Sequence, residues 1–91
     1  MHDWTLVSLL FDWKEARLTL ALRNSNSDSV SLVAYGVVRF MVPKQNEWGG
    51  SVMVNRVTGP TQQPDGTEEL QIEVQSGDVI QITAASFAVP S

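Results

Sequence analysis

Strict alternation of apolar and polar residues is the feature that most limits what this 91-residue chain can fold into. Residues 69–75 read Glu-Leu-Gln-Ile-Glu-Val-Gln, so Leu70, Ile72 and Val74 share one face of an extended strand. A helix repeats every 3.6 residues and would scatter these side chains around its axis. The pattern therefore predicts a half-buried strand with one face in water.

Two further segments repeat this pattern. Residues 76–78 (Ser-Gly-Asp) connect the first strand to a second apolar run at 79–83, which predicts a β-hairpin. Segment 16–23 alternates Leu18, Leu20 and Leu22 with polar or small residues, which favours a strand. Its glutamate, alanine, arginine and leucine content would also suit a helix, so a helix remains an alternative there.

The segment from Trp4 to Trp13 differs, because it carries apolar residues on both faces. Such a strand is either central and covered on both sides, or interrupted by a bulge. Trp13 is in line with Phe11 and is expected to join the core, since tryptophan in a small β-domain is usually buried. Residues 12–15 are expected to form a hairpin turn. The two apolar sets are Val7, Leu9, Phe11 and Trp13 at odd positions and Trp4, Leu6 and Leu10 at even positions.

The middle of the chain predicts more strands of uneven length. Residues 30–42 exceed the usual strand length, so Gly36 is expected to mark a bulge or a break. Residues 51–57 predict another strand, and 58–67, with two prolines, a flexible surface loop. The fold expected for residues 1–91 is a single all-β domain, a small, mostly antiparallel sandwich or partly open barrel of six to seven strands.

Charge is unevenly distributed along the chain. All six basic residues lie in the first 56 positions, whereas Val57 and beyond contain five acids and no base. The net charge of −4 argues against nucleic acid as a partner, because such binders need a basic surface. The acidic half is expected either to pair with basic residues across strands or to face a basic partner. No signal peptide or apolar run of about 18 residues is visible, which predicts a cytoplasmic protein without membrane contact.

The sequence offers no catalytic constellation. It has no cysteine, and His2 is its single histidine, so neither a zinc site nor a nucleophilic triad can be completed from these residue types. Gly49-Gly50-Ser51 lacks the lysine and following helix of a phosphate-binding loop. We therefore expect no enzymatic activity, no cofactor and no metal ion.

Trp48 is the most unusual of the three tryptophans, since it lies in the turn-prone stretch 43–51 between Glu47 and two glycines. It is expected either to cover one end of the core or to anchor a partner, because tryptophan is favoured in interface hot spots. We expect the binding residues to be Trp48, Glu47, Glu69 and Glu73. A small-ligand or carbohydrate-binding module, which would stack a sugar on Trp48 and a second ring, is the alternative function.

Two short blocks of the sequence carry recognisable motifs. They are His2-Asp3-Trp4-x-Leu6-x-Ser8-x-x-Phe11-Asp12-Trp13 and Glu47-Trp48-Gly49-x-Ser51-Val52-x-Val54-Asn55, with Leu18, Leu20 and Leu22 following the first. These blocks resemble small bacterial all-β proteins, some of which act as immunity proteins in toxin–immunity loci. The resemblance implies an all-β fold and a protein-binding role, and it transfers no catalytic residue. The chain is thus expected to bind a protein partner or a second copy of itself as a homodimer.

Overall fold

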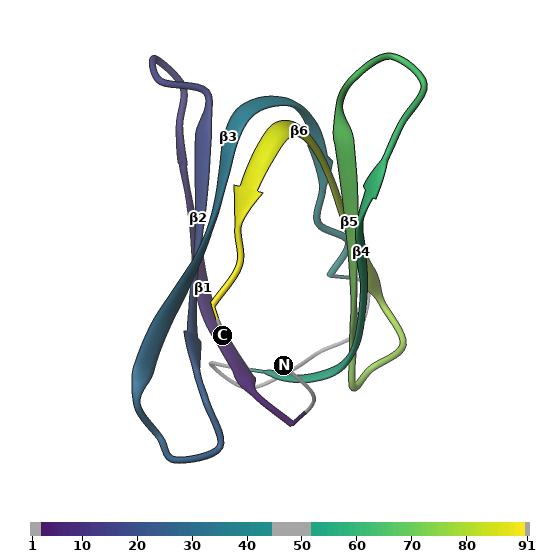
Figure 1. Cartoon of the computed structure of the whole chain (residues 1–91). Helices are drawn as coiled ribbons and strands as arrows, with labels where there is room; N and C mark the ends of the chain where they lie inside the picture. Colours follow the sequence, from purple (N-terminus) through teal and green to yellow (C-terminus); the bar gives the residue numbers. More distant parts are fainter. Residues whose placement is uncertain (1–2, 45–51, 91) are drawn as a thin grey trace.

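The computed structural model describes residues 3–44 and 52–90, and every regular element in them is a β-strand (Figure 1). The all-β prediction is confirmed, and the helix alternative for residues 16–23 is wrong. No helix long and apolar enough to cross a membrane occurs in the described ranges. The six strands are β1 (Thr5–Asp12), β2 (Arg17–Arg23), β3 (Ser29–Met41), β4 (Val52–Gln62), β5 (Glu68–Val74) and β6 (Val79–Ala88).

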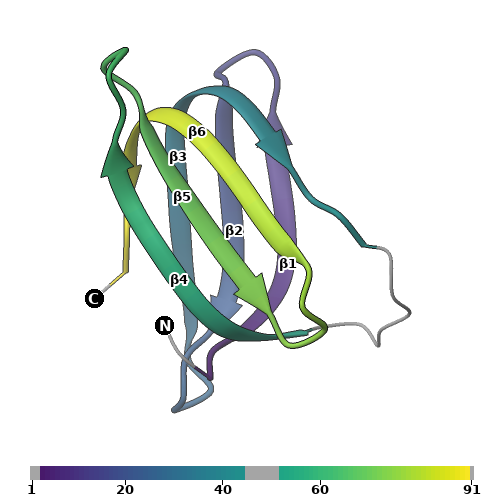
Figure 2. The ribbon, with the colours of Figure 1, turned by 90° about the vertical axis from the view of Figure 1, so that its right-hand side faces the viewer.

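The strands form one antiparallel sheet in the order β1-β2-β3-β6-β5-β4, which closes on itself where β1 meets β4 (Figures 1 and 2). This closing seam is short. β1 and β4 pair at Thr5↔Met53 and Leu6↔Val52, and two backbone bonds between Val54 and residues 3–4 extend the contact. β1 pairs with β2, in contrast, along its whole length. As far as the described residues show, the architecture is therefore a barrel that is closed at the start of β1 and open beside the rest of that strand.

β3 is long because it belongs to both halves of the sheet. Its first part pairs with β2 as far as Ala34, and residues 33–41 pair with β6. Gly36 lies at the transition with φ +63°, and a Cβ there would come within 2.9 Å of the Ala85 side chain. The predicted irregularity is confirmed: the strand stays continuous, with a register shift between Val37 and Arg39.

β4 extends farther than its sequence suggests. Residues 58–62, predicted to begin a flexible loop, instead continue the strand and pair with β5. Pro60 lies within the register shift between Thr58 and Thr61. A proline is tolerated at such a bulge because its missing N–H removes no regular ladder bond.

The core consists of apolar side chains from the inner faces of all six strands. No polar or charged residue of the described chain is buried. The alternation in residues 69–75 predicts its contribution correctly, since Leu70, Ile72 and Val74 are all fully buried. The core residues are Leu6, Leu18, Leu20, Leu22, Leu32, Ala34, Val54, Leu70, Ile72, Val74, Ile80, Ile82 and Ala84.

β1 contains a bulge, which explains its two apolar faces. The register with β2 shifts between Leu6 and Ser8, so the inward positions change from even to odd numbers along the strand. Leu6 is buried, whereas Leu9 and Phe11 pack against the core from the partly open side. The expectation that Trp13 joins the core is wrong: the residue is 86% exposed. β1 ends at Asp12, so the tryptophan lies in the turn beyond the last covered layer.

Candidate functional site

The sheet is open between β1 and the second half of β3. Beyond Leu6, β1 has no second neighbouring strand among the described residues, and β3 has none on its β2 side beyond Ala34. A backbone bond from Val37 N–H to Ala16 O, at 2.8 Å, connects β3 to the turn between β1 and β2. We call the opening between residues 8–12 of β1 and 38–41 of β3 the slit. It is flanked by two strand edges whose outward backbone groups face no other strand of the described chain.

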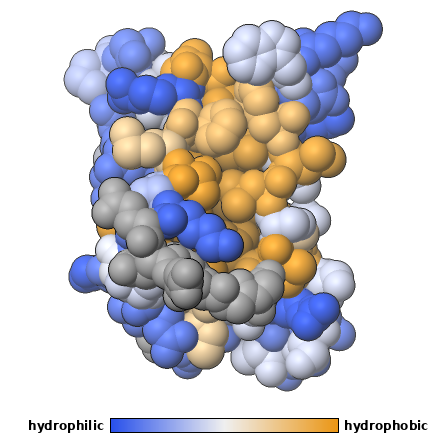
Figure 3. Space-filling model, turned by 180° about the vertical axis from the view of Figure 1, so that it is seen from behind, coloured by the Kyte–Doolittle hydropathy of each residue, from blue (hydrophilic) through white to orange (hydrophobic). Residues whose placement is uncertain are grey.

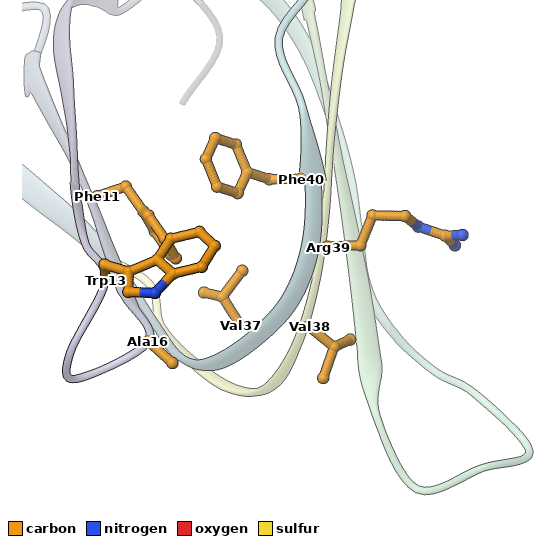
Figure 4. A pocket seen from close by; sticks show the side chains of 7 residues that line it. All are labelled: Phe11, Trp13, Ala16, Val37, Val38, Arg39 and Phe40. Carbon is orange, nitrogen blue, oxygen red and sulfur yellow. The ribbon is translucent and has the colours of Figure 1, made fainter.

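Aromatic side chains from both sides meet at the base of the slit. Phe11 of β1 and Phe40 of β3 lie with ring centroids 4.8 Å apart at an interplanar angle of 46°. Trp13 contacts Phe11 edge to face, with centroids 5.6 Å apart and planes at 85°. Figure 4 shows these rings and Val37 pointing into the space between the strands, while the Arg39 guanidinium points away from it. They border a hollow of about 340 Å³, whose lining residues are Phe11, Trp13, Ala16, Val37, Val38, Arg39 and Phe40.

The slit leaves core-facing side chains in contact with solvent. Phe40 is opposite the fully buried Ile82 and so lies on the inner face of the sheet, yet it is 37% exposed. In a fully closed barrel the adjoining strand would cover such a ring. Leu10, Val38 and Met41, on the two flanking strands, are 71%, 69% and 57% exposed. Figure 3 shows the resulting band of hydrophobic surface, bordered by hydrophilic residues.

The charges around the slit are predominantly basic. Lys14, Arg17, Arg39 and Lys44 lie on or next to the flanking strands, against two acids, Asp12 and Glu15. The Asp12 carboxylate already has partners close to it in the sequence. It accepts a hydrogen bond from the Glu15 N–H at 3.1 Å and lies 3.8 Å from the Arg17 guanidinium. Counted over the described residues, the local net charge is +2 (four bases, two acids), in a chain whose net charge is −4. The C-terminal acids lie on β5 and in the turns next to it, at Asp65, Glu68, Glu69, Glu73 and Asp78.

The predicted binding residues do not gather at the slit. Trp48 and Glu47 lie outside the described residues. Glu69 and Glu73 are half-buried on β5, and neither lines the hollow. The Glu73 carboxylate lies 3.4 Å from the Arg56 guanidinium on β4, so an acid of the C-terminal half does pair with a base across strands.

The residues of the slit were not recognised in the sequence, although a signal for them exists. The first segment carries apolar residues on both faces, and Leu10 on its outer face is exposed because no second layer covers that side of the sheet. Phe40, Met41 and Val42 form a second apolar run at the end of β3. Either run can be recognised as exposed surface only when it is known that no strand of the described chain lies between residues 8–12 and 38–41.

The chemistry of the hollow suits apolar groups. Its lining side chains are aliphatic or aromatic except for Arg39, whose guanidinium is directed outwards. No group of three or more histidine, cysteine, aspartate or glutamate residues that could hold a metal ion occurs in the ranges 3–44 and 52–90. The rings of Phe11, Trp13 and Phe40 are steeply inclined to one another, so a flat sugar could stack on one of them at a time.

The chain matches no protein-family model and no curated protein sequence. It is similar in structure to an uncharacterized protein from Neisseria gonorrhoeae solved by crystallography, with a TM-score of 0.65 and 14% sequence identity. The superposition covers 97% of this chain and 90% of the other. At this identity the similarity shows a shared fold.

Proposed function

We propose that this chain is a non-enzymatic domain that binds another protein through the slit. The observation that carries the proposal is the exposure of aromatic and aliphatic side chains along a gap in the sheet, above all Trp13 at 86%. Contiguous exposed apolar surface rimmed by polar residues is typical of protein interaction sites. Tryptophan is among the residues most enriched in the energetic centres of interfaces.

The favourable free energy that a partner could gain by covering Trp13 is large for one side chain. A tryptophan can bury roughly 250 Å², and 86% exposure leaves roughly 215 Å² of it in water. At roughly 25 cal/mol per Å², complete burial would contribute about 5 kcal/mol before the costs of association. Leu10, Val38 and Met41 would add to this gain if the partner extended over both flanking strands.

The resemblance to immunity-type proteins supports a partner protein rather than a small molecule, and the lining of the hollow supports the same choice. Carbohydrate-binding modules present several coplanar rings, whereas Phe11, Trp13 and Phe40 are inclined to one another. We propose a cytoplasmic location for the interaction, in keeping with a chain that contains no cysteine. Trp48 remains a proposed second contact.

The test compares tagged wild-type protein with Trp13→Ala and Glu73→Gln variants in capture experiments from the native host. We expect wild type and Glu73→Gln to retain the same partner, and Trp13→Ala to lose at least about tenfold in recovery. Glu73→Gln is the control because it changes a half-buried side chain on β5 that does not line the hollow. Trp48→Ala, run in parallel, tests the second contact.

Two results would contradict the proposal. Retention of the partner by Trp13→Ala at the wild-type level would remove the slit as the binding surface. Loss of the partner by Glu73→Gln alone would move the interface to the acidic face of β5. Thermal unfolding must show that each variant is folded, since an unfolded variant would lose the partner without any specific binding defect.

A further inference from the structure

We infer that the slit receives an extended segment of the partner, which pairs with the free edge of β1 as an added strand and carries acidic residues at its ends. This inference rests on the proposed function and specifies the shape and charge of what is bound. It follows from three features of the described residues: an unpaired strand edge, an apolar floor and a basic rim.

The edge of β1 is a regular template for another strand. From Ser8↔Ala21 to Asp12↔Arg17 the register with β2 is unbroken, so residues 8–12 hold an undistorted extended backbone. Their outward N–H and C=O groups face no other strand within the described ranges. An exposed regular edge of this kind can accept the backbone of an extended peptide. The facing edge of β3 is less suitable, because its register shifts between Val37 and Arg39.

The floor of the slit determines the side-chain pattern of the added strand. Successive residues of a strand point to opposite faces, so every second residue of the segment would face Phe11 and Phe40. These positions require apolar side chains, because the floor offers them no hydrogen-bonding group. The intervening residues would lie beside Leu10 on the outer face, where β-branched or aromatic side chains form favourable cross-strand pairs.

The rim determines the charge of the segment. Lys14 and Lys44, which follow β1 and β3 in the chain, are exposed and form no ion pair in the part of the chain that the structure describes. Acidic residues at the ends of the added strand would be attracted to them. A second copy of this chain is a poorer occupant, because two slits facing each other would bring together two surfaces of net charge +2. The charge pattern therefore favours a different protein over a homodimer.

The experiment selects ligands from a displayed library of random twelve-residue peptides against the full chain, with Trp13→Ala protein as the counter-selection. We expect enriched peptides with apolar residues at every second position and aspartate or glutamate at both ends. Replacing the acidic ends by lysine should raise the dissociation constant about tenfold at low salt, because two or three weak ion pairs are lost. A Leu10→Ser variant, which removes another exposed apolar side chain of β1, shows whether weaker binding by Trp13→Ala reflects a lost contact or an unstable fold.

Amide hydrogen exchange of the complex then tests the mode of binding. Strand addition should slow exchange at residues 8–12 of β1 by at least about tenfold, because the added backbone bonds protect their outward amides. Strand β5, which carries three glutamates and lies away from the slit, serves as the internal control and should change little.

The outcomes separate this inference from the proposed function. Peptides that depend on Trp13 but show helical spacing, basic ends or no protection of residues 8–12 would overturn strand addition and leave binding at the slit intact. Absence of any Trp13-dependent peptide would overturn the inference, and the capture experiment would then decide the proposed function independently. A stable dimer in analytical ultracentrifugation, abolished by Leu10→Ser, would replace the partner segment with a second copy.

Discussion

Replacing Trp13 by alanine should cost this protein much less stability than replacing a buried leucine, although tryptophan is the larger side chain. Trp13 is 86% exposed, so roughly one seventh of its surface, about 35 Å², is covered. At roughly 25 cal/mol per Å² the lost burial is worth about 0.9 kcal/mol. The edge contact with Phe11 adds a few tenths of a kcal/mol at an exposed site.

Leu20 provides the comparison, because it is fully buried in the centre of β2. Leu20→Ala would leave a cavity among tightly packed neighbours and should cost about 2–5 kcal/mol. Urea unfolding followed by far-UV circular dichroism at 25 °C measures both free energies. For a domain of this size each 1 kcal/mol corresponds to about 4–8 °C in Tm, so thermal unfolding should rank the variants in the same order.

The expectation is contradicted if Trp13→Ala lowers the free energy of unfolding by more than about 2 kcal/mol, or by as much as Leu20→Ala does. Either result would mean that the indole ring covers the end of the core in solution and is not available at the slit. The slope of the urea transition must stay constant between the variants, since a changed slope would indicate a changed unfolded state.

Two further predictions concern backbone conformation and pH. Gly36→Ala should destabilise the fold by about 1–3 kcal/mol, because φ is +63° and the new Cβ would lie 2.9 Å from that of Ala85. Gly66→Ala, at φ +90° with no atom within 4 Å, should cost less, and equal losses in chemical unfolding would refute a steric role for Ala85. Hydrogen bonds from the Thr67 side chain and backbone lower the pKa of Asp65 below its ordinary 3.8, so their stabilisation is present above that value and is lost as pH falls through the lowered pKa. Thr67→Val should raise the pKa of Asp65 in an NMR titration; an unchanged pKa would contradict the assignment.

Much of the fold could be predicted from short stretches of sequence. The alternation in residues 69–75 and in 17–23 identifies β5, β2 and the faces they bury, because a strand's side chains change sides at every residue regardless of its neighbours. The hairpin at Ser76–Asp78 and the irregularity near Gly36 follow from equally local properties. β4 was harder to predict: Pro60 suggests a loop, and its acceptance within a bulge depends on pairing with β5.

The candidate site could not be predicted in the same way. Trp13 continues the alternation of Phe11 in the sequence, but it lies in the turn beyond β1 and is exposed. Whether anything covers it depends on strands distant in the sequence. Glu69 and Glu73 are recognisable as outward-facing acids. That Arg56 would lie beside Glu73 is a consequence of the register between β4 and β5.

The sequence by itself determined which segments are extended and which face of each is apolar, since both depend on the local period of two. Tertiary structure alone decided where the barrel stays open. β1 joins β4 over two residue pairs, and its remaining edge faces no other strand within residues 3–44 and 52–90. This pairing joins residues nearly fifty positions apart, and its extent depends on the bends and register shifts of β1, β3 and β4 together. Phe40 is in contact with solvent for that reason, whereas Trp13 is exposed because it lies in the turn beyond the end of β1.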